Sequence, residues 1–122
     1  MYGRMTRLQT SPDAVEKGIA FFKENVVPKA RTTSGNAGAI LLVDRKTGTA
    51  IGITLWETTQ ALNASEQLGI SSRTQGAAAT GGSIVDVDRY EQVLVDRAQP
   101  PKTGAFITER WIRRNGSARP SM

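Results

Sequence analysis

Residues 39–56 read AILLVDRKTGTAIGITLW, and this stretch decides the fold. Two strand-like runs flank a polar turn, residues 44–48, whose last residue is Gly48. This arrangement predicts a β-hairpin. The first run, residues 39–43, is apolar on both faces, which predicts a strand that is buried on both sides.

The second strand of the hairpin, residues 49–56, has two unlike faces. Alternation puts Ile51, Ile53 and Leu55 on one face, and Ala50, Gly52, Thr54 and Trp56 on the other. Three of the four residues on the second face are small. We therefore expect this face to leave space for a ligand, with Trp56 at the end of that space.

A strand and a helix are predicted before the hairpin. Residues 2–10 form a short strand, and residues 11–13, Ser-Pro-Asp, suit a helix start in which Ser11 offers the N-cap oxygen. Apolar side chains then recur at helical spacing: Val15, Ile19, Phe22 and Val26. Pro28 is expected to end or kink this helix near Val27, and a loop over 32–38 follows.

A helix and a strand are predicted after the hairpin. Thr58 suits the N-cap of the second helix. Gly69 weakens that helix, which resumes over 72–79 and ends in a Gly-rich loop. Residues 84–96 form a long strand, and a slip in its alternation over 88–90 predicts a bulge.

The predicted element order is β-α-β-β-α-β, which indicates a ferredoxin-like α+β domain. Its four-stranded antiparallel sheet would carry both helices on one face. We assign this domain to residues 1–96 and a C-terminal extension, either an arm or a partly disordered basic tail, to residues 97–122. The whole chain has 16 Lys and Arg and 11 Asp and Glu, and most of this basic excess lies in the extension. Residues 110–122 hold four arginines and no acid, which leaves 12 against 11 elsewhere.

The sequence contains no Cys and no His, and this excludes several kinds of site. There is no thiolate for zinc or an iron–sulfur cluster, no thiol nucleophile and no Ser-His-Asp triad. No apolar run reaches the roughly 18–20 residues that a membrane span needs. Arg4 and Arg7 are not followed by the apolar core of a signal peptide, so we expect a cytoplasmic protein.

The apolar pattern of the hairpin also predicts an oligomer. Two helices cover one face of the sheet, while the other face would expose a sizeable apolar patch. Patches of this kind usually mark an interface or a ligand groove. We therefore expect a homodimer in which two sheets pack face to face. The alternative is a monomer whose open face is covered by residues 97–122.

Several stretches of residues 2–95 resemble the dimeric α+β barrel superfamily, in particular its antibiotic-biosynthesis-monooxygenase-like domains. They are VVP at 26–28, LLVDRKTG at 41–48, TLWET at 54–58, ALNASE at 61–66 and YEQV at 90–93. The resemblance implies a dimeric barrel. Some members of the family oxidise polyketide-like aromatics without a cofactor, and others degrade haem with a His ligand. The absence of His argues against the haem branch.

Four residues are our candidates for the lining of an apolar pocket: Trp56, Phe22, Phe21 and Asn36. The alternative for each of them is plain core packing. Oxygenation without a cofactor needs a group that makes or holds a substrate anion. The candidates are Asp86, Asp88, Glu57 and Arg4, and spacing singles out none of them, so no catalytic residue is assigned. We expect no metal and no cofactor.

Two functions remain open at this point. The first is a homodimeric barrel that binds, or oxidises without metal or flavin, an apolar or aromatic small molecule. The second is a non-catalytic dimerisation or interaction module with a packed interior.

Two further kinds of site are less favoured by the sequence. Asp86 and Asp88 share a strand face and could hold Mg²⁺ or Ca²⁺, but a solvated edge is the commoner meaning of such a pair. The same element order also serves RNA-binding modules, which stack bases on strand aromatics. Aliphatic side chains at 41–43 and 51–53 replace those aromatics, which argues against nucleic-acid binding.

Overall fold

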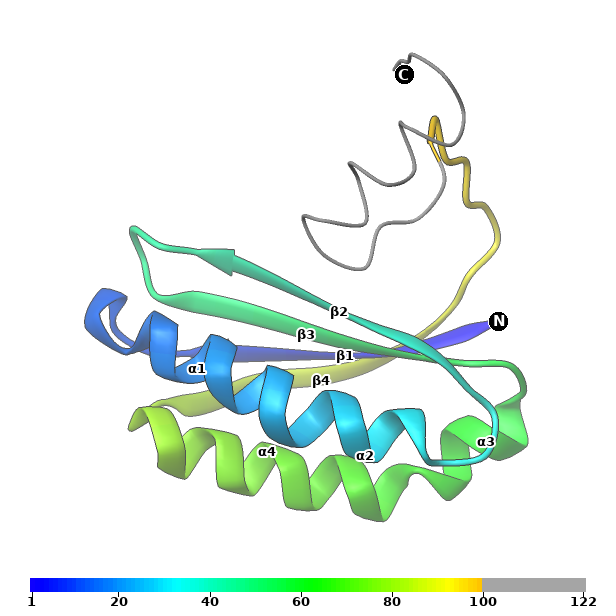
Figure 1. The fold of residues 1–122 in the computed structure, drawn as a ribbon, viewed down its shortest axis with the longest axis horizontal. Helices are drawn as coiled ribbons and strands as arrows, with labels where there is room; N and C mark the ends of the chain where they lie inside the picture. The colour runs from blue at the N-terminus through cyan, green and yellow to red at the C-terminus, as the bar shows by residue number, and fades with distance from the viewer. Residues whose placement is uncertain (100–122) are drawn as a thin grey trace, which may run out of the picture.

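A computed structural model describes residues 1–99 of the chain. Its strands are β1 (Tyr2–Gln9), β2 (Asn36–Asp44), β3 (Thr49–Trp56) and β4 (Ser83–Glu91). They form one antiparallel sheet in the order β2-β3-β1-β4, with the helices on one face (Figure 1). The predicted ferredoxin-like α+β arrangement is confirmed, including the hairpin, where the Gly48 N–H donates to the Asp44 carbonyl at 2.9 Å.

The first helical segment is continuous but changes its winding. It comprises a 3₁₀ turn η1 (Pro12–Ala14), α1 (Val15–Phe21), a π-helical turn η2 (Phe22–Val26) and α2 (Val27–Arg31). Pro28 does not end the helix, because the wider π turn lets the Val27 N–H donate to the Phe22 carbonyl just before the proline. The predicted cap at Ser11 is also wrong in detail. Within residues 1–99 its hydroxyl makes no capping bond, and its carbonyl accepts from the Ala14 N–H.

The second helical segment divides at Ser65, between α3 (Thr59–Ala64) and α4 (Glu66–Thr80). The Thr58 hydroxyl accepts from the Ala61 N–H at 3.0 Å, which confirms the predicted N-cap. Gly69 does not interrupt the helix, contrary to expectation. The helix ends instead at Gly81, whose φ of 70° is the left-handed conformation that glycine adopts without strain.

Two strand boundaries differ from the prediction. β2 begins at Asn36, inside the expected loop, because the main chain there already pairs with β3. β4 ends at Glu91 and not at Asp96, because its partner β1 ends: the Gln92 N–H donates to the Met1 carbonyl. The bulge lies opposite Arg7 and Leu8, near Val85, and not at 88–90.

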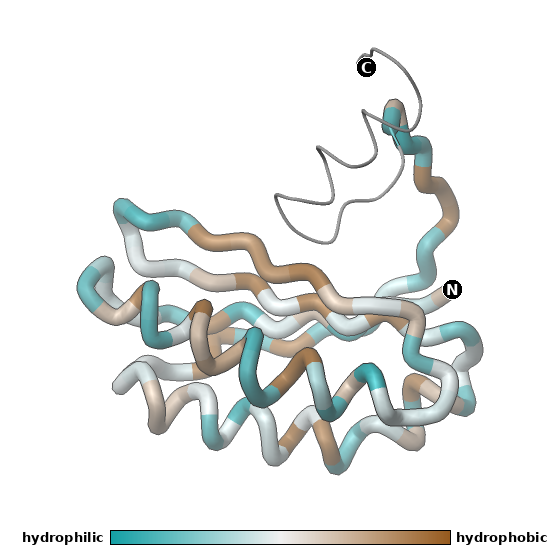
Figure 2. The backbone as a smooth tube through the Cα atoms, viewed as in Figure 1, coloured by the Kyte–Doolittle hydropathy of each residue, from teal (hydrophilic) through white to brown (hydrophobic). Residues whose placement is uncertain are grey.

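The two faces of the sheet have different surroundings. The helix-covered face holds the buried Trp56, and Leu62 and Ala30 are buried on the helices. The opposite face, called the open face below, carries Met5, Ile40, Leu42, Ile51, Ile53, Leu55 and Tyr90. The hydropathy view shows apolar colour along β2 and β3 (Figure 2).

The prediction that β2 is buried on both sides is wrong within residues 1–99. Ile40 is 42% exposed and Leu42 53% exposed. β2 is an edge strand, and in the described part of the chain no helix covers the open face. Most of the expected extension, residues 100–122, lies outside the described residues. None of the helices between residues 1 and 99 is both long and apolar enough to cross a membrane.

Candidate functional site

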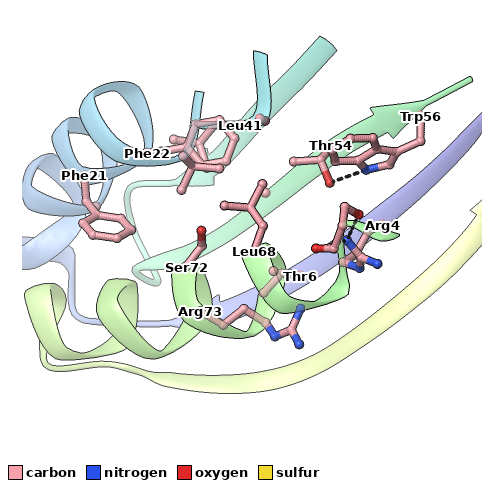
Figure 3. A pocket seen from close by; sticks show the side chains of 16 residues that line it. Arg4, Thr6, Phe21, Phe22, Leu41, Thr54, Trp56, Leu68, Ser72 and Arg73 are labelled. Carbon is pink, nitrogen blue, oxygen red and sulfur yellow. Dashed lines mark hydrogen bonds between the residues drawn. The ribbon is translucent and has the colours of Figure 1, made fainter. Parts of the chain in front are cut away.

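A cavity of about 110 Å³ lies between the sheet and the helices (Figure 3). We call it the helix–sheet cavity. Its floor is the face of the sheet that carries Thr6 on β1, Leu41 on β2, and Gly52 and Thr54 on β3. Glycine matters at position 52, because a Cβ there would stand only 3.0 Å from the Phe22 ring. The missing side chain thus lets the ring lie against the sheet.

The helices supply the apolar walls of this cavity. Phe21, Phe22 and Val26 come from α1 and η2, and Leu68 comes from α4 on the opposite side. Phe21 lies against α4 where Gly76 provides room, since a Cβ at that position would meet the ring at 3.3 Å. Such a lining suits an apolar or aromatic guest.

Trp56 lines the cavity at the end of β3 and is fully buried. Its indole Nε1–H donates to the Thr54 hydroxyl at 3.0 Å, so the polar atom of the ring has a partner within the same strand (Figure 3). A buried indole N–H needs such a partner, and the bond holds the ring in one orientation.

Three of the four predicted pocket residues line the cavity, and one does not. Phe21, Phe22 and Trp56 are brought together by η2, α1 and β3. Asn36 is not among the lining residues, because its amide donates to the Leu55 carbonyl at 3.1 Å and to the Gly38 carbonyl at 3.3 Å. That side chain ties the start of β2 to β3. The ligand-binding role of the other three stays a prediction.

One end of the cavity is cationic. Arg4 on β1 is only 4% exposed, and its guanidinium crosses to the junction of α3 and α4. Its Nη1 donates to the Ser65 hydroxyl at 2.6 Å, and its Nη2 donates to the Leu62 carbonyl at 2.7 Å and to Glu66 Oε1 at 2.9 Å. These bonds hold the chain at Ser65, where the helix divides.

Glu66 also accepts from two further arginines. Arg89 of β4 donates to it at 2.8 Å, and Arg73 of α4 donates at 3.4 Å. We call Arg4, Arg73 and Arg89 with Glu66 the arginine cluster. It contains three guanidinium groups and one carboxylate, so its formal charge is +2.

The pKa values of the cluster follow from burial and charge. Burial lowers the pKa of Arg4, and the Glu66 carboxylate only partly offsets this effect. Burial acting alone would raise the pKa of Glu66, but the charge of Arg4 and the hydrogen bonds from Arg89 and Arg73 hold that pKa below its ordinary value. Glu66 is therefore ionised as the central anion of the cluster at neutral pH.

The remaining candidate groups lie elsewhere. Asp86 faces Arg7 at 3.4 Å, and Asp88 and Glu57 are exposed. Between residues 1 and 99 no carboxylate lines the helix–sheet cavity. The same residues contain no group of three carboxylates that could hold a metal ion. Arg4 is the one candidate from that set that reaches the cavity.

The sequence pattern did not indicate Glu66 and Arg73 as site residues. They stand 62 and 69 positions from Arg4, and no local pattern joins them. One feature of the sequence pointed to such partners. Arg4 lies on the same strand face as Thr6 and is in register with Thr54, so its guanidinium faces the helices and needs acceptors there.

Comparison with known proteins gives relatives of undetermined role. The chain is 32% identical over 113 residues to the uncharacterized protein Rv2558 of Mycobacterium tuberculosis, and 30% identical to Rv2557 of the same organism. Each match covers 93% of this chain. The chain spans about half the length of these relatives, 48% and 50%. No protein-family model matches the chain.

Solved structures identify the class of fold. A candidate antibiotic biosynthesis monooxygenase from Deinococcus radiodurans matches with a TM-score of 0.64, at 13% identity, over 82% of this chain and all of that one. A monooxygenase from Streptomyces coelicolor in complex with nanaomycin D matches with 0.63, at 12% identity, over 80% and 92%. SnoaB, a cofactor-independent oxygenase from Streptomyces nogalater, matches with 0.54, at 15% identity, over 77% and 94%.

The chain therefore has the fold of the antibiotic-biosynthesis-monooxygenase-like domains, as its resemblance to that superfamily implied. At these identities the likeness extends to the fold and not to the activity. What the chain does has to be argued from the cavity.

Proposed function

We propose that the chain binds an apolar, aromatic small molecule in the helix–sheet cavity. The observation that carries this proposal is the cavity lining. Phe21, Phe22, Leu41 and Trp56 line a space of about 110 Å³, which is large enough for several water molecules. A plain core would fill such a space with side chains, since protein interiors pack closely.

Oxidation of the guest is the second part of the proposal. The nanaomycin D complex and the cofactor-independent oxygenase share this fold and support that reaction class. Dioxygen would be the oxidant. A ring methylene of the substrate would lose two hydrogens and gain one oxygen atom as a carbonyl, while the second oxygen atom leaves as water. The arginine cluster would favour the substrate anion that reacts with dioxygen, because positive charge stabilises a developing negative charge.

A homodimer is the third part of the proposal. On the open face, Ile40 is 42% exposed, Leu42 53% and Tyr90 56%. Burying apolar surface stabilises a complex by about 25 cal/mol per Å², and a second copy of the same sheet offers a complementary surface. We propose that two copies pack through their open faces.

A non-catalytic interaction module is the second candidate function. One observation favours it: among the residues that line the cavity in the described chain, none is a carboxylate or a tyrosine that could act as a base. Binding and oxidation are therefore tested separately.

Fluorescence of Trp56 tests binding. In a Trp111→Phe background, Trp56 is the remaining tryptophan. We expect 2-naphthamide, an uncharged aromatic probe, to change that fluorescence in a saturable manner. Ser72→Phe should lower the affinity for 2-naphthamide at least tenfold, because Ser72 lines the cavity and a phenyl ring there would fill it.

Ser71→Phe is the matched control, since Ser71 is exposed on the same helix. Equal responses from the two phenylalanine variants would refute the cavity as the binding site. Oxygen uptake measured with an electrode, with anthrone as a test compound because it is an aromatic molecule with a ring methylene, then separates a binding protein from an oxygenase.

A further inference from the structure

The helix–sheet cavity joins an apolar body to a cationic end, and this combination limits what the cavity can recognise. Phe21, Phe22, Leu41 and Leu68 form the apolar body, and Arg4 and Arg73 also line the cavity (Figure 3). A guest that is apolar throughout would offer no acceptor to the donors of these two guanidinium groups that Glu66 and the main chain do not already satisfy. Burial of charge without a partner is costly.

Two donors of these guanidinium groups lack an acceptor. Arg4 Nε and Arg73 Nη1 are both buried, and neither has a hydrogen-bond partner within residues 1–99. Every other nitrogen of the Arg4 guanidinium has one. Arg4 is 4% exposed and the Arg73 side chain 16% exposed, so bulk water satisfies these donors poorly. Buried donors are normally paired, and an exception calls for an acceptor.

Glycine at position 69 leaves room for both guanidinium groups beside α4. A Cβ on Gly69 would stand 3.0 Å from Arg73 Nη1 and 3.4 Å from Arg4 Nη1. Both groups therefore lie against the same turn of α4, where a side chain at position 69 would make them shift. The position explains why a glycine stands within a helix at a cost in helix propensity.

The charge of the cluster points the same way. Arg4, Arg73 and Arg89 share one carboxylate, Glu66, and its contact with Arg73 is the longest of the three at 3.4 Å. Of the two arginines that line the cavity, Arg73 therefore has the weaker ion pair with Glu66. A second anion would complete the cluster, and the cavity is the space through which it could arrive.

We propose that the guest is an aromatic carboxylate, whose ring lies among the phenylalanines and whose two oxygens accept from Arg4 Nε and Arg73 Nη1. Two unpaired donors on separate side chains match the two oxygens of one carboxylate, and charge-assisted bonds of this kind are about twice as strong as neutral ones. This inference rests on the proposed binding function and adds to it the chemical class of the ligand.

Two probes of the same shape test the inference. 2-Naphthoate carries the carboxylate, and 2-naphthamide replaces it by an uncharged amide. Dissociation constants are measured by Trp56 fluorescence with the full chain carrying Trp111→Phe. We expect 2-naphthoate to bind roughly tenfold or more tightly than the amide. In Arg73→Gln the preference for 2-naphthoate over the amide should fall severalfold, because Arg4 Nε is then the one proposed donor left to the carboxylate.

Arg45→Gln is the matched control. It also removes one positive charge, but Arg45 lies on the hairpin, is 63% exposed and pairs with Glu16. It should leave the preference for the carboxylate intact. Arg73→Lys, which keeps the charge but loses the planar group, should retain more of the preference than Arg73→Gln does. Thermal unfolding of each variant shows whether it is folded.

The outcomes separate this inference from the function on which it rests. If both probes bind with equal affinity, the carboxylate assignment is wrong while the cavity remains a binding site. If neither probe binds the folded protein, both proposals fail. A preference for 2-naphthoate that is undiminished in Arg73→Gln overturns the assignment as well, because Arg73 Nη1 is then not one of the donors that hold the anion.

Discussion

Glu66 is the residue on which the cationic end of the cavity depends. It is the common acceptor for Arg4, Arg73 and Arg89, at 2.9, 3.4 and 2.8 Å. Those three arginines come from β1, α4 and β4, so the carboxylate joins the sheet to the helix layer. Its removal leaves Arg4, which is 4% exposed, with one fewer acceptor in a buried place.

Glu66→Gln should therefore destabilise the protein by about 1–2 kcal/mol at pH 7, the cost of leaving a buried donor poorly satisfied. The loss should depend on pH. Because the folded-state pKa of Glu66 is lowered, its contribution is complete above the ordinary value of 4.5 and disappears as pH falls through the folded-state pKa. Urea unfolding of both proteins at pH 7 and at successively lower pH measures the difference, which should shrink on acidification.

Glu16→Gln is the control for that measurement. Glu16 pairs with Arg45, but the two side chains are 70% and 63% exposed, and exposed pairs contribute little. We expect almost no change in stability. A Glu66→Gln loss that is constant from pH 7 downwards would contradict the role given to its charge.

At the scale of the elements, the two helical segments are capped differently at their N-termini. Thr58 and Ser11 occupy equivalent N-cap positions with extended backbone conformations. Only the Thr58 hydroxyl accepts a capping bond, from the Ala61 N–H. For the helix that follows Ser11 a backbone carbonyl makes the first contact instead.

Thr58→Ala should cost about 1 kcal/mol of stability, the usual effect of losing a side-chain cap. Ser11→Ala should cost no more than a few tenths of that amount, because it removes no capping bond. Thr58→Ser should keep most of the stability, since the hydroxyl remains. Thermal or urea unfolding of the three variants compares them, and equal losses at positions 11 and 58 would contradict the assignment of the caps.

Local patterns predicted the elements well where one chain segment determines its own structure. The hairpin turn at 44–48, the cap at Thr58 and the alternation of β3 all depend on neighbouring residues, and each is found as expected. The helix break moved from Gly69 to Ser65, because Arg4 binds the chain there. An arginine 61 positions away leaves no trace in the local pattern.

The candidate site was predictable in its apolar part and not in its polar part. Phe22 and Trp56 follow from helical and strand periodicity, which places them on the inner faces of their elements. Asn36 does not line the cavity, since the extended start of β2 lets its amide bond to main-chain carbonyls. The arginine cluster draws on β1, α4 and β4, so it exists only once the sheet order is known.

At the scale of the whole molecule, the open face predicts association. Leu42 is 53% exposed on that face, so Leu42→Arg leaves the core of one copy intact while adding charge to the proposed interface. We expect the wild-type chain to sediment as a dimer at micromolar concentration and Leu42→Arg as a monomer with an unchanged circular dichroism spectrum. Gln75→Arg, at an exposed site on α4, should remain dimeric.

A wild-type chain that sediments as a monomer would contradict this prediction. The covering of the open face by residues 97–122 of the same chain is the alternative that such a result would favour. The helix–sheet cavity lies on the other side of the sheet, so the binding proposal stands or fails separately.

The crystal structure of the protein with 2-naphthoate tests the central claim most directly, because it locates the ligand. The predicted result is a naphthalene ring between Phe21, Phe22 and Leu41, with its carboxylate within hydrogen-bonding distance of Arg73 Nη1. A helix–sheet cavity without ligand at saturating concentration, or a ligand bound only to the open face, would contradict the claim.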